Sequence, residues 1–179
     1  MASRRVASNT SRDENRLVLT RPLLLIDVDG VLNPYLGASD VVPEGYGAHR
    51  LGGMSVVLCA SHGRWLHELA ALFDLVWAST WEADAEALIG PTIGAPAGIP
   101  HLTFSERDPE DWTWKLPAVE RHVGDRPVAW LDDDPGHGAA DWAATRAAPT
   151  LLIRPSPRVG WTRAERDQLV AFATALLAG

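Results

Sequence analysis

The stretch 21-RPLLLIDVDGVLNPYLG-37 combines the most hydrophobic run of the chain with two aspartates and a glycine. Asp27 follows four apolar residues, and Asp29 comes two positions later, directly before Gly30. A carboxylate that is buried without a partner is strongly unfavourable. The two acids therefore need either a place at the exposed end of a strand or a cation beside them.

Residues 22–28 are predicted to form a buried strand, because the run is short, apolar and bounded by Pro22 and Gly30. Three later segments have the same character: 74–79, 127–133 and 149–155. Helical patterns lie between them, so strand and helix alternate along the chain. This order predicts an α/β fold, a doubly wound parallel sheet with helices on both faces. Ligands of such sheets bind beyond the carboxyl ends of the strands.

The expected helices have recognisable start signals. Ser61 is expected to cap a helix whose apolar face runs from Trp65 to Phe73. Thr162 and Glu165 have the spacing of a capping box at the start of the last helix. The remaining expected elements are helices over 81–90, 117–122 and 139–147, a hairpin with its turn at Gly52-Gly53, and a short strand over 101–104.

Length and composition fit one soluble domain. The chain has 179 residues, and its net charge of -7 disfavours general binding to nucleic acids or anionic membranes. The single cysteine, Cys59, excludes an internal disulfide and favours a cytoplasmic location. Residues 1–20 are polar and are predicted to be a disordered leader before a single domain over 21–179. No apolar run approaches the roughly 18 residues that span a bilayer.

Polar residues gather at the predicted carboxyl ends of three strands. They are Asp27 and Asp29, Ser79 and Thr80, and 132-DDD-134. Lys115, the only lysine of the chain, precedes the helix between the second and third of these strands. Acids grouped at one sheet edge repel one another unless a cation lies among them, and Mg²⁺ is the simplest hard cation that meets this need. A hydroxyl and an ammonium beside Mg²⁺ would receive the oxygens of a phosphoryl group.

The segment 27-DVDGVLN-33 resembles the first motif of the haloacid dehalogenase (HAD) superfamily of phosphohydrolases. Ser79, Lys115 and 132-DD-133 are similar to its second, third and fourth motifs in order and placement, so the resemblance covers residues 22 to about 155. A closer resemblance is to a small HAD branch that occurs within multidomain RNA-repair proteins and as stand-alone proteins. It is carried by 75-LVWASTWEADA-85, 112-WTWK-115 and 129-AWLDDD-134.

The resemblance implies that the first motif carries the chemistry. Asp27 is the expected nucleophile, which forms an aspartyl-phosphate, and one of its oxygens would bind Mg²⁺. Asp29 is the expected general acid for the leaving alcohol and then the general base for water. The backbone carbonyl of Asp29 would be a further metal ligand.

The resemblance also assigns the residues that bind the phosphoryl group and the metal. Ser79 would bind a phosphoryl oxygen, with Thr80 as the alternative one position along. Lys115 would neutralise charge on the nucleophile and on the phosphate. Asp132 and Asp133 would hold Mg²⁺ directly or through water.

Structural interpretations stand beside these roles. Aspartates and a glycine after a strand are typical of an ordinary turn, and Ser79 or Thr80 is placed to cap the next helix. Lys115 has the usual alternative of an exposed helix lysine, and Asp134 is either a third acidic contact or a turn residue. Stacking on a base or sugar competes with packing as the use of the tryptophans that flank the site: Trp81, Trp112 and Trp114.

The spacing of the motifs leaves little room for a cap domain. Residues 30–61 hold a flap at most, and residues 90–113 are too few for a separate domain. An open site suits a large phosphorylated substrate, such as a nucleic-acid end, a nucleotide or a phosphoprotein, and it also admits a small molecule. The alternatives are a catalytically weak HAD-fold domain that binds or regulates, and a receiver-like module that accepts phosphate as a signal. The intact pair Asp27 and Asp29 argues against both.

Overall fold

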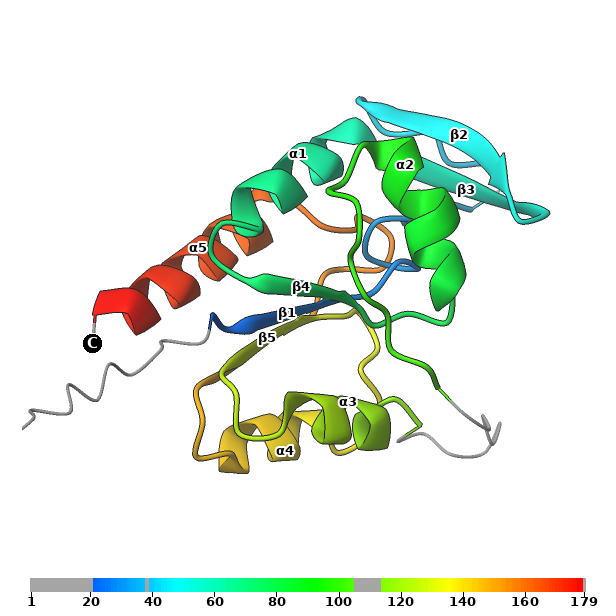
Figure 1. Cartoon of the computed structure of the whole chain (residues 1–179). Coiled ribbons are helices and arrows are strands. Elements are labelled where there is room, and N and C mark those ends of the chain that lie inside the picture. Colours follow the sequence, from blue (N-terminus) through cyan, green and yellow to red (C-terminus); the bar gives the residue numbers. More distant parts are fainter. Residues whose placement is uncertain (1–20, 38, 105–113, 179) are drawn as a thin grey trace, which may run out of the picture.

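The computed structural model describes residues 21–37, 39–104 and 114–178. They form an α/β fold around a four-stranded parallel sheet that is flanked by helices (Figure 1). The predicted leader, residues 1–20, lies outside the described residues. None of the helices in the described part of the chain has the length and apolar character that crossing a membrane requires.

The first predicted strand lies inside the sheet. The four strands are β1 (Leu23–Ile26), β4 (Asp74–Trp77), β5 (Val128–Leu131) and β6 (Thr150–Ile153). Their order is β4-β1-β5-β6, so β1 has a parallel neighbour on each side. Every residue of β1 is buried, which explains why its sequence is continuously apolar rather than alternating.

The strands end level with one another. Ile26 is in register with Trp77 in β4 and with Leu131 in β5, and Leu131 is in register with Ile153 in β6. Neighbouring strands lie about 4.8 Å apart. The residues that directly follow these strands are therefore placed side by side at one edge of the sheet.

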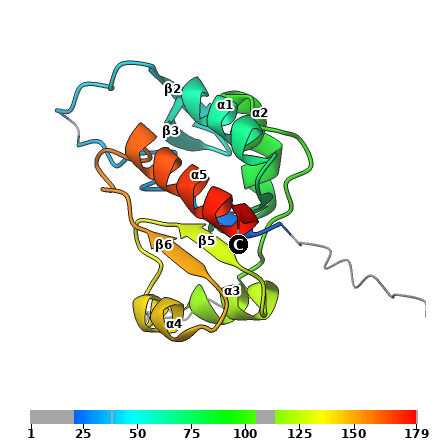
Figure 2. The same ribbon diagram turned by 90° about the vertical axis from the view of Figure 1, so that its left-hand side faces the viewer.

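Helices cover both faces of the sheet (Figures 1 and 2). The helices α1 (Ala60–Leu69) and α5 (Arg163–Ala178) pack on one face, while α3 (Leu116–Val123) and α4 (Ala139–Thr145) pack on the other. A four-residue helix, α2 (Gly90–Ile93), lies beside α1 on the first face.

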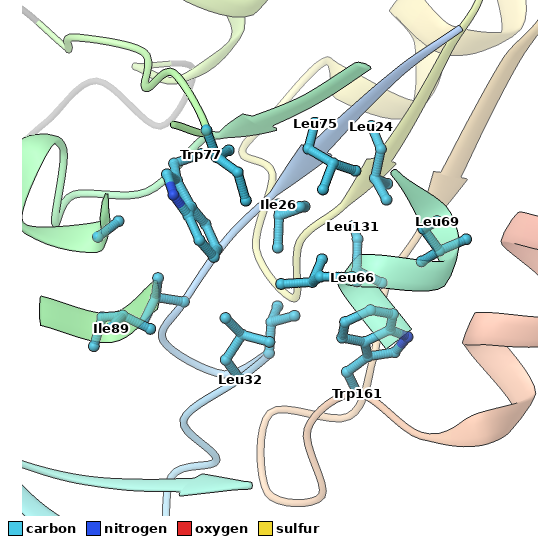
Figure 3. Close-up of a cluster of buried hydrophobic side chains, with 14 of the residues drawn as sticks. Leu24, Ile26, Leu32, Leu66, Leu69, Leu75, Trp77, Ile89, Leu131 and Trp161 are labelled. Carbon is cyan, nitrogen blue, oxygen red and sulfur yellow. The ribbon is translucent and has the colours of Figure 1, made fainter. Parts of the chain in front are cut away.

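Alternate residues of β1 enter two separate cores. Leu24 and Ile26 belong to the larger core with Leu66 of α1, which Figure 3 shows in close-up. Leu23 and Leu25 belong to the core under α3 and α4. Because fully burying one such side chain contributes about 1.5–3 kcal/mol, the two cores fix this strand and its register firmly.

A two-stranded hairpin is inserted between β1 and α1. It consists of β2 (Tyr46–Leu51) and β3 (Met54–Cys59), paired antiparallel. Its two turn residues, Gly52 and Gly53, have φ angles of 54° and 83°, which is the left-handed backbone that tight hairpin turns need. The predicted hairpin is confirmed, and it is the flap that the sequence allows in this gap.

Two predicted helix signals are confirmed. The Thr162 hydroxyl accepts a hydrogen bond from Ala164 N at 3.2 Å, and the Glu165 carboxylate accepts one from Thr162 N at 2.9 Å, which is a capping box before α5. Pro117 lies in the first turn of α3, and Gly124 follows the last residue of that helix.

Two local predictions are wrong, those for Ser61 and for residues 101–104, and a third is right only in part. Ser61 does not cap α1, because the helix already begins at Ala60 and the Ser61 hydroxyl instead accepts a hydrogen bond from Arg64 at 2.7 Å. The helix expected over 81–90 contains a π-helical turn, η1 (Ala85–Ile89), and runs on to Ile93 as α2. Pro91 has no N–H for the regular helical ladder, and the wider turn directly precedes it. Residues 101–104 form a single bridge to Trp77 and no strand.

The helices α1 and α5 are joined through His62, which is 1% exposed. Its Nε2–H donates to the carbonyl oxygen of Trp161 at 2.9 Å, and its ring stacks on the Trp161 indole with 5.3 Å between the centroids. Burial lowers the pKa of His62 from 6.5 to about 4, only partly opposed by the hydrogen bond to Trp161. The folded protein therefore holds this imidazole neutral.

The neutral imidazole makes stability depend on pH in a defined direction. Because the folded pKa lies below the unfolded value, the contribution of His62 is complete above about pH 6.5 and is lost as the pH falls towards 4. Between pH 7.5 and 4.5 we expect His62 to account for a loss of roughly 2–3 kcal/mol in the free energy of unfolding.

Urea denaturation at the two pH values measures this loss. His62→Gln keeps an N–H donor for the Trp161 carbonyl but cannot titrate, so it should show a smaller loss than the wild type. Equal losses in the two proteins would contradict the prediction.

Candidate functional site

The level strand ends bring two of the predicted acids together. Asp27 follows β1 and Asp132 follows β5, and the backbone continues the ladder at both positions. Asp27 N donates to Leu131 O at 3.0 Å, and Asp132 N donates to Ile153 O at 3.1 Å. Asp27 is 5% exposed and Asp132 is fully buried. The first and fourth predicted motifs are therefore neighbours across one pair of strands.

Lys115 lies between these two carboxylates. Its Nζ is 2.5 Å from Oδ2 of Asp27 and 2.6 Å from Oδ2 of Asp132. The lysine is only 4% exposed, so the interpretation as a solvated surface lysine is wrong. It immediately precedes α3, whose packing under the sheet brings the ammonium to the strand ends.

The charges of this triad depend on one another. Burial opposes the charge of Lys115, but Asp132 and Asp27 more than compensate and raise its pKa, so the ammonium stays protonated. Burial and the neighbouring charge of Asp27 raise the pKa of Asp132, although Lys115 acts in the opposite direction. The single ammonium of Lys115 does not neutralise all the carboxylates at these strand ends.

Asp133 adds a third carboxylate. Burial and the charge of Asp27 raise the pKa of Asp133 to about 6. Oxygens of Asp27, Asp132 and Asp133 all lie within 4.8 Å of one another. Carboxylate oxygens at this spacing fit the needs of a hard cation, and the excess negative charge beside Lys115 favours one. The buried cluster is thus able to bind a metal ion.

The side chain of Asp29 has a different setting from that of Asp27. Its Oδ1 accepts a hydrogen bond from the Asn33 amide at 2.7 Å, and its Oδ2 accepts one from the Trp81 indole at 3.0 Å. The Asn33 side-chain oxygen in turn accepts a hydrogen bond from Val57 N in β3 at 2.9 Å. The Asp29 side chain therefore lies outside the cluster of Asp27, Asp132 and Asp133, and Asn33 connects it to the hairpin.

Gly30 explains why a glycine follows the two acids. Its φ is 74°, a left-handed conformation that turns the chain directly after Asp29. A β-carbon at this position would lie 2.3 Å from Cγ of Asp133. The absence of a side chain at Gly30 makes the space in which the Asp133 carboxylate lies.

The two candidate hydroxyls after β4 lie in different places. Ser79 is fully buried, and its Oγ is 3.5 Å from Trp81 N, the geometry of a local turn contact. Thr80 is exposed and lines the same pocket as Asp27. Of the two, Thr80 is thus the hydroxyl residue that faces the open site.

These residues surround an open pocket of about 340 Å³. Its lining consists of Asp27, Asp29, Tyr35, Thr80, Trp114, Lys115, Asp133 and Asp134. The structure therefore places four of the predicted acids, the lysine and Thr80 around one pocket, and Asp134 is the exposed one of these acids. Trp112 lies outside the described residues.

Sequence reasoning missed Tyr35 and the contacts of Asn33 and Trp81. Tyr35 is in an irregular loop where no periodicity or motif marks it. Asn33 ends the first motif, but only the fold shows that its side chain bonds both Asp29 and β3. Trp81 is 6% exposed, and its indole is used to hold Asp29.

A scan of the chain against protein-family models finds no match, and a search of curated proteins finds no significant match. The interpretation of the site therefore depends on the geometry of its residues.

The close contact at Gly30 predicts a specific effect on cation binding. Gly30→Ala should strain the backbone and displace Asp133, and so weaken the binding of a divalent cation measured by calorimetry. Gly53→Ala is the matched control, because Gly53 also has a positive φ, of 83°, but no atom lies within 4 Å of an added β-carbon. Gly53→Ala should lose about 1–2 kcal/mol of stability from its positive φ alone, and Gly30→Ala should lose more because of the collision with Asp133. Only Gly30→Ala should bind the cation less well. Unchanged cation binding in Gly30→Ala would show that Asp133 does not depend on this space.

The contacts of Asn33 predict a coupling between the hairpin and Asp29. Asn33→Ala leaves both Val57 N and the Asp29 carboxylate short of one partner, so we expect a loss of about 1–3 kcal/mol in unfolding free energy. Amide exchange at Val57 should also become faster. Ser55→Ala, an exposed residue of the same strand, should change stability by no more than about 0.5 kcal/mol. Unaltered exchange at Val57 would mean that the hairpin is held without Asn33.

Proposed function

We propose that this protein is a Mg²⁺-dependent phosphomonoester hydrolase of the HAD type that acts through an aspartyl-phosphate on Asp27. The observation that carries the proposal is the contact of Lys115 with Asp27 and Asp132, next to Asp133, at the ends of two neighbouring parallel strands. A nucleophilic carboxylate, a fixed ammonium and a cluster of metal ligands are the parts that phosphoryl transfer through aspartate needs.

The order of the elements supports a doubly wound HAD core. The proposed nucleophile follows β1, which lies between β4 and β5. The chain forms β4 on one side of β1 before it forms β5 and β6 on the other side. Thr80 and Ser79 follow β4, and the acids Asp132 and Asp133 follow β5. The insertion after β1 is the β2–β3 hairpin, which supports a core with a minimal cap.

In the first step, a carboxylate oxygen of Asp27 attacks the phosphorus and forms a new O–P bond as the bond to the leaving oxygen breaks. Asp29 gives its proton to that oxygen, so the product leaves as a neutral alcohol. Lys115 stabilises negative charge on Asp27 and on the phosphoryl oxygens, and the Thr80 or Ser79 hydroxyl donates to one of those oxygens.

In the second step, the ionised Asp29 takes a proton from water, whose oxygen attacks the phosphorus and releases phosphate from Asp27. The Asn33 amide and the Trp81 indole hold the Asp29 carboxylate for both proton transfers. Asp27, Asp132, Asp133 and the backbone carbonyl of Asp29 would hold Mg²⁺. When bound, Mg²⁺ supplies charge compensation for the acids and for the phosphoryl oxygens.

The test is hydrolysis of 4-nitrophenyl phosphate with and without Mg²⁺. We expect Mg²⁺-dependent release of phosphate by the wild type and a loss of at least about 10³-fold in Asp27→Asn, because the covalent step has no nucleophile. Asp29→Asn should also lose turnover but should accumulate the aspartyl-phosphate, which mass spectrometry of the acid-quenched protein detects.

The same experiment separates the alternatives. A binding or regulatory domain would hydrolyse no phosphate ester while Mg²⁺ still raised its melting temperature. A receiver-like module would become phosphorylated on Asp27, and Asp29→Asn would not change the lifetime of that phosphate. Failure of Mg²⁺ both to support turnover and to raise the melting temperature would contradict the proposed metal site itself.

A further inference from the structure

The lining of the acidic pocket includes two aromatic residues that the chemistry above does not use. Tyr35 comes from the loop after β1, and Trp114 comes from the turn before α3. They belong to segments far apart in the sequence, and both line the pocket that contains Asp27 and Asp29. The pocket is thus lined by aromatic surface as well as by charged groups.

The position of Trp114 is set by its neighbours. Its ring packs edge-on against Phe104, with 5.1 Å between the centroids and an angle of 75° between the planes. Lys115 Nζ lies 5.4 Å from the Trp114 ring centroid, and the same Nζ is 2.5 Å from Asp27. A group bonded to a phosphate at Asp27 is therefore within reach of this indole.

Tyr35 is 53% exposed, yet it lies close to the acids. Its backbone N donates to Pro157 O at 2.8 Å, which anchors the loop beside the segment that follows β6. Burial and the charges of Asp29 and Asp133 raise the pKa of the Tyr35 phenol to about 12, so the ring is neutral at physiological pH. Trp81 differs from Tyr35, because its side chain is buried and its indole is bonded to Asp29.

The charges of the lining disfavour additional anionic groups. The described lining contains four carboxylates, those of Asp27, Asp29, Asp133 and Asp134, and the single ammonium of Lys115. That ammonium is already shared by Asp27 and Asp132. Arg154 lies near, but its guanidinium donates to the backbone oxygen of Asp133 and is outside the described lining. A leaving group with further phosphates would meet carboxylates rather than cations.

From these observations we propose that the pocket selects small phosphate monoesters whose alcohol carries a flat, uncharged ring, with Tyr35 and Trp114 as the walls that contact the ring. This inference rests on the proposed function and names the substrate class of the same site. Stacking of a ring on aromatic side chains tolerates many ring structures, so the selection is for a class of leaving group.

The first test compares kcat/KM for four esters at equal Mg²⁺. Two have an uncharged ring on an alkyl alcohol, benzyl phosphate with the ring one carbon from the ester oxygen and a nucleoside 5′-monophosphate with the ring one sugar away. Glycerol 1-phosphate has no ring, and a nucleoside 3′,5′-bisphosphate has a ring and an additional charged group. We expect kcat/KM for each of the two ring esters to exceed the values for glycerol 1-phosphate and for the bisphosphate by roughly tenfold or more. The better of the two ring esters shows how far the walls lie from the phosphorus.

Variants then test the walls. Trp114→Ala and Tyr35→Ala should each reduce the preference for the ring ester over glycerol 1-phosphate roughly tenfold, mainly through KM, while Trp114→Phe and Tyr35→Phe retain it. Val159→Ala, an exposed apolar residue outside the lining of this pocket, is the control and should leave the ratio unchanged. A ratio that both alanine variants leave intact would overturn the proposal.

A binding measurement separates failure of this inference from failure of the proposed function. Benzylphosphonate and propylphosphonate cannot be hydrolysed, and calorimetry with Mg²⁺ compares their affinities for the wild-type protein. Tighter binding of benzylphosphonate without turnover of any ester would support the aromatic walls and overturn the hydrolase. Turnover of all four esters with equal kcat/KM, or equal binding of the two phosphonates, would overturn the walls and leave the hydrolase in place.

Discussion

The contact of one buried ammonium with two carboxylates is the constraint on which the site depends. Lys115 bonds Asp27 after β1 and Asp132 after β5, and all three side chains are removed from water. Breaking such a group by removing one partner leaves a buried charge without compensation, which typically costs 3–5 kcal/mol. The triad therefore joins two strands and the start of α3 at the one edge of the sheet where apolar packing ends. Hydrophobic burial stabilises the sheet, and this triad fixes the positions of the charged side chains at its edge.

Around this centre, each neighbouring group has both a structural and a functional consequence. Gly30 turns the chain and leaves room for Asp133, so the backbone of the first motif is in close contact with the carboxylate of the fourth motif. Asn33 bonds Asp29 and β3 together, so the hairpin is connected to the proposed acid and base. The flap is small, and Tyr35 and Trp114 both line the open pocket.

Much of the fold was predictable because its signals are local. The four apolar runs became four parallel strands, and the capping box at Thr162, the hairpin turn at Gly52-Gly53 and the helix opened by Pro117 all appear where the sequence places them. The errors have different local causes. Ser61 lost its capping position because β3 ends at Cys59 and α1 begins directly after it at Ala60. The helix after β4 widened into a π turn before Pro91.

By itself, the sequence determined that acids lie at the ends of apolar strands. Aspartates that follow a buried apolar run are accommodated at the end of a strand, because a carboxylate buried without a partner is strongly unfavourable. It also singled out Lys115, which is the only lysine. Tertiary structure alone decided that this lysine is buried between Asp27 and Asp132, that Thr80 rather than Ser79 lines the pocket, and that Tyr35 and Trp114 line it together. These facts depend on strand register and on loops that are distant in sequence, and distances between such segments are set by the packing of the whole sheet and its helices.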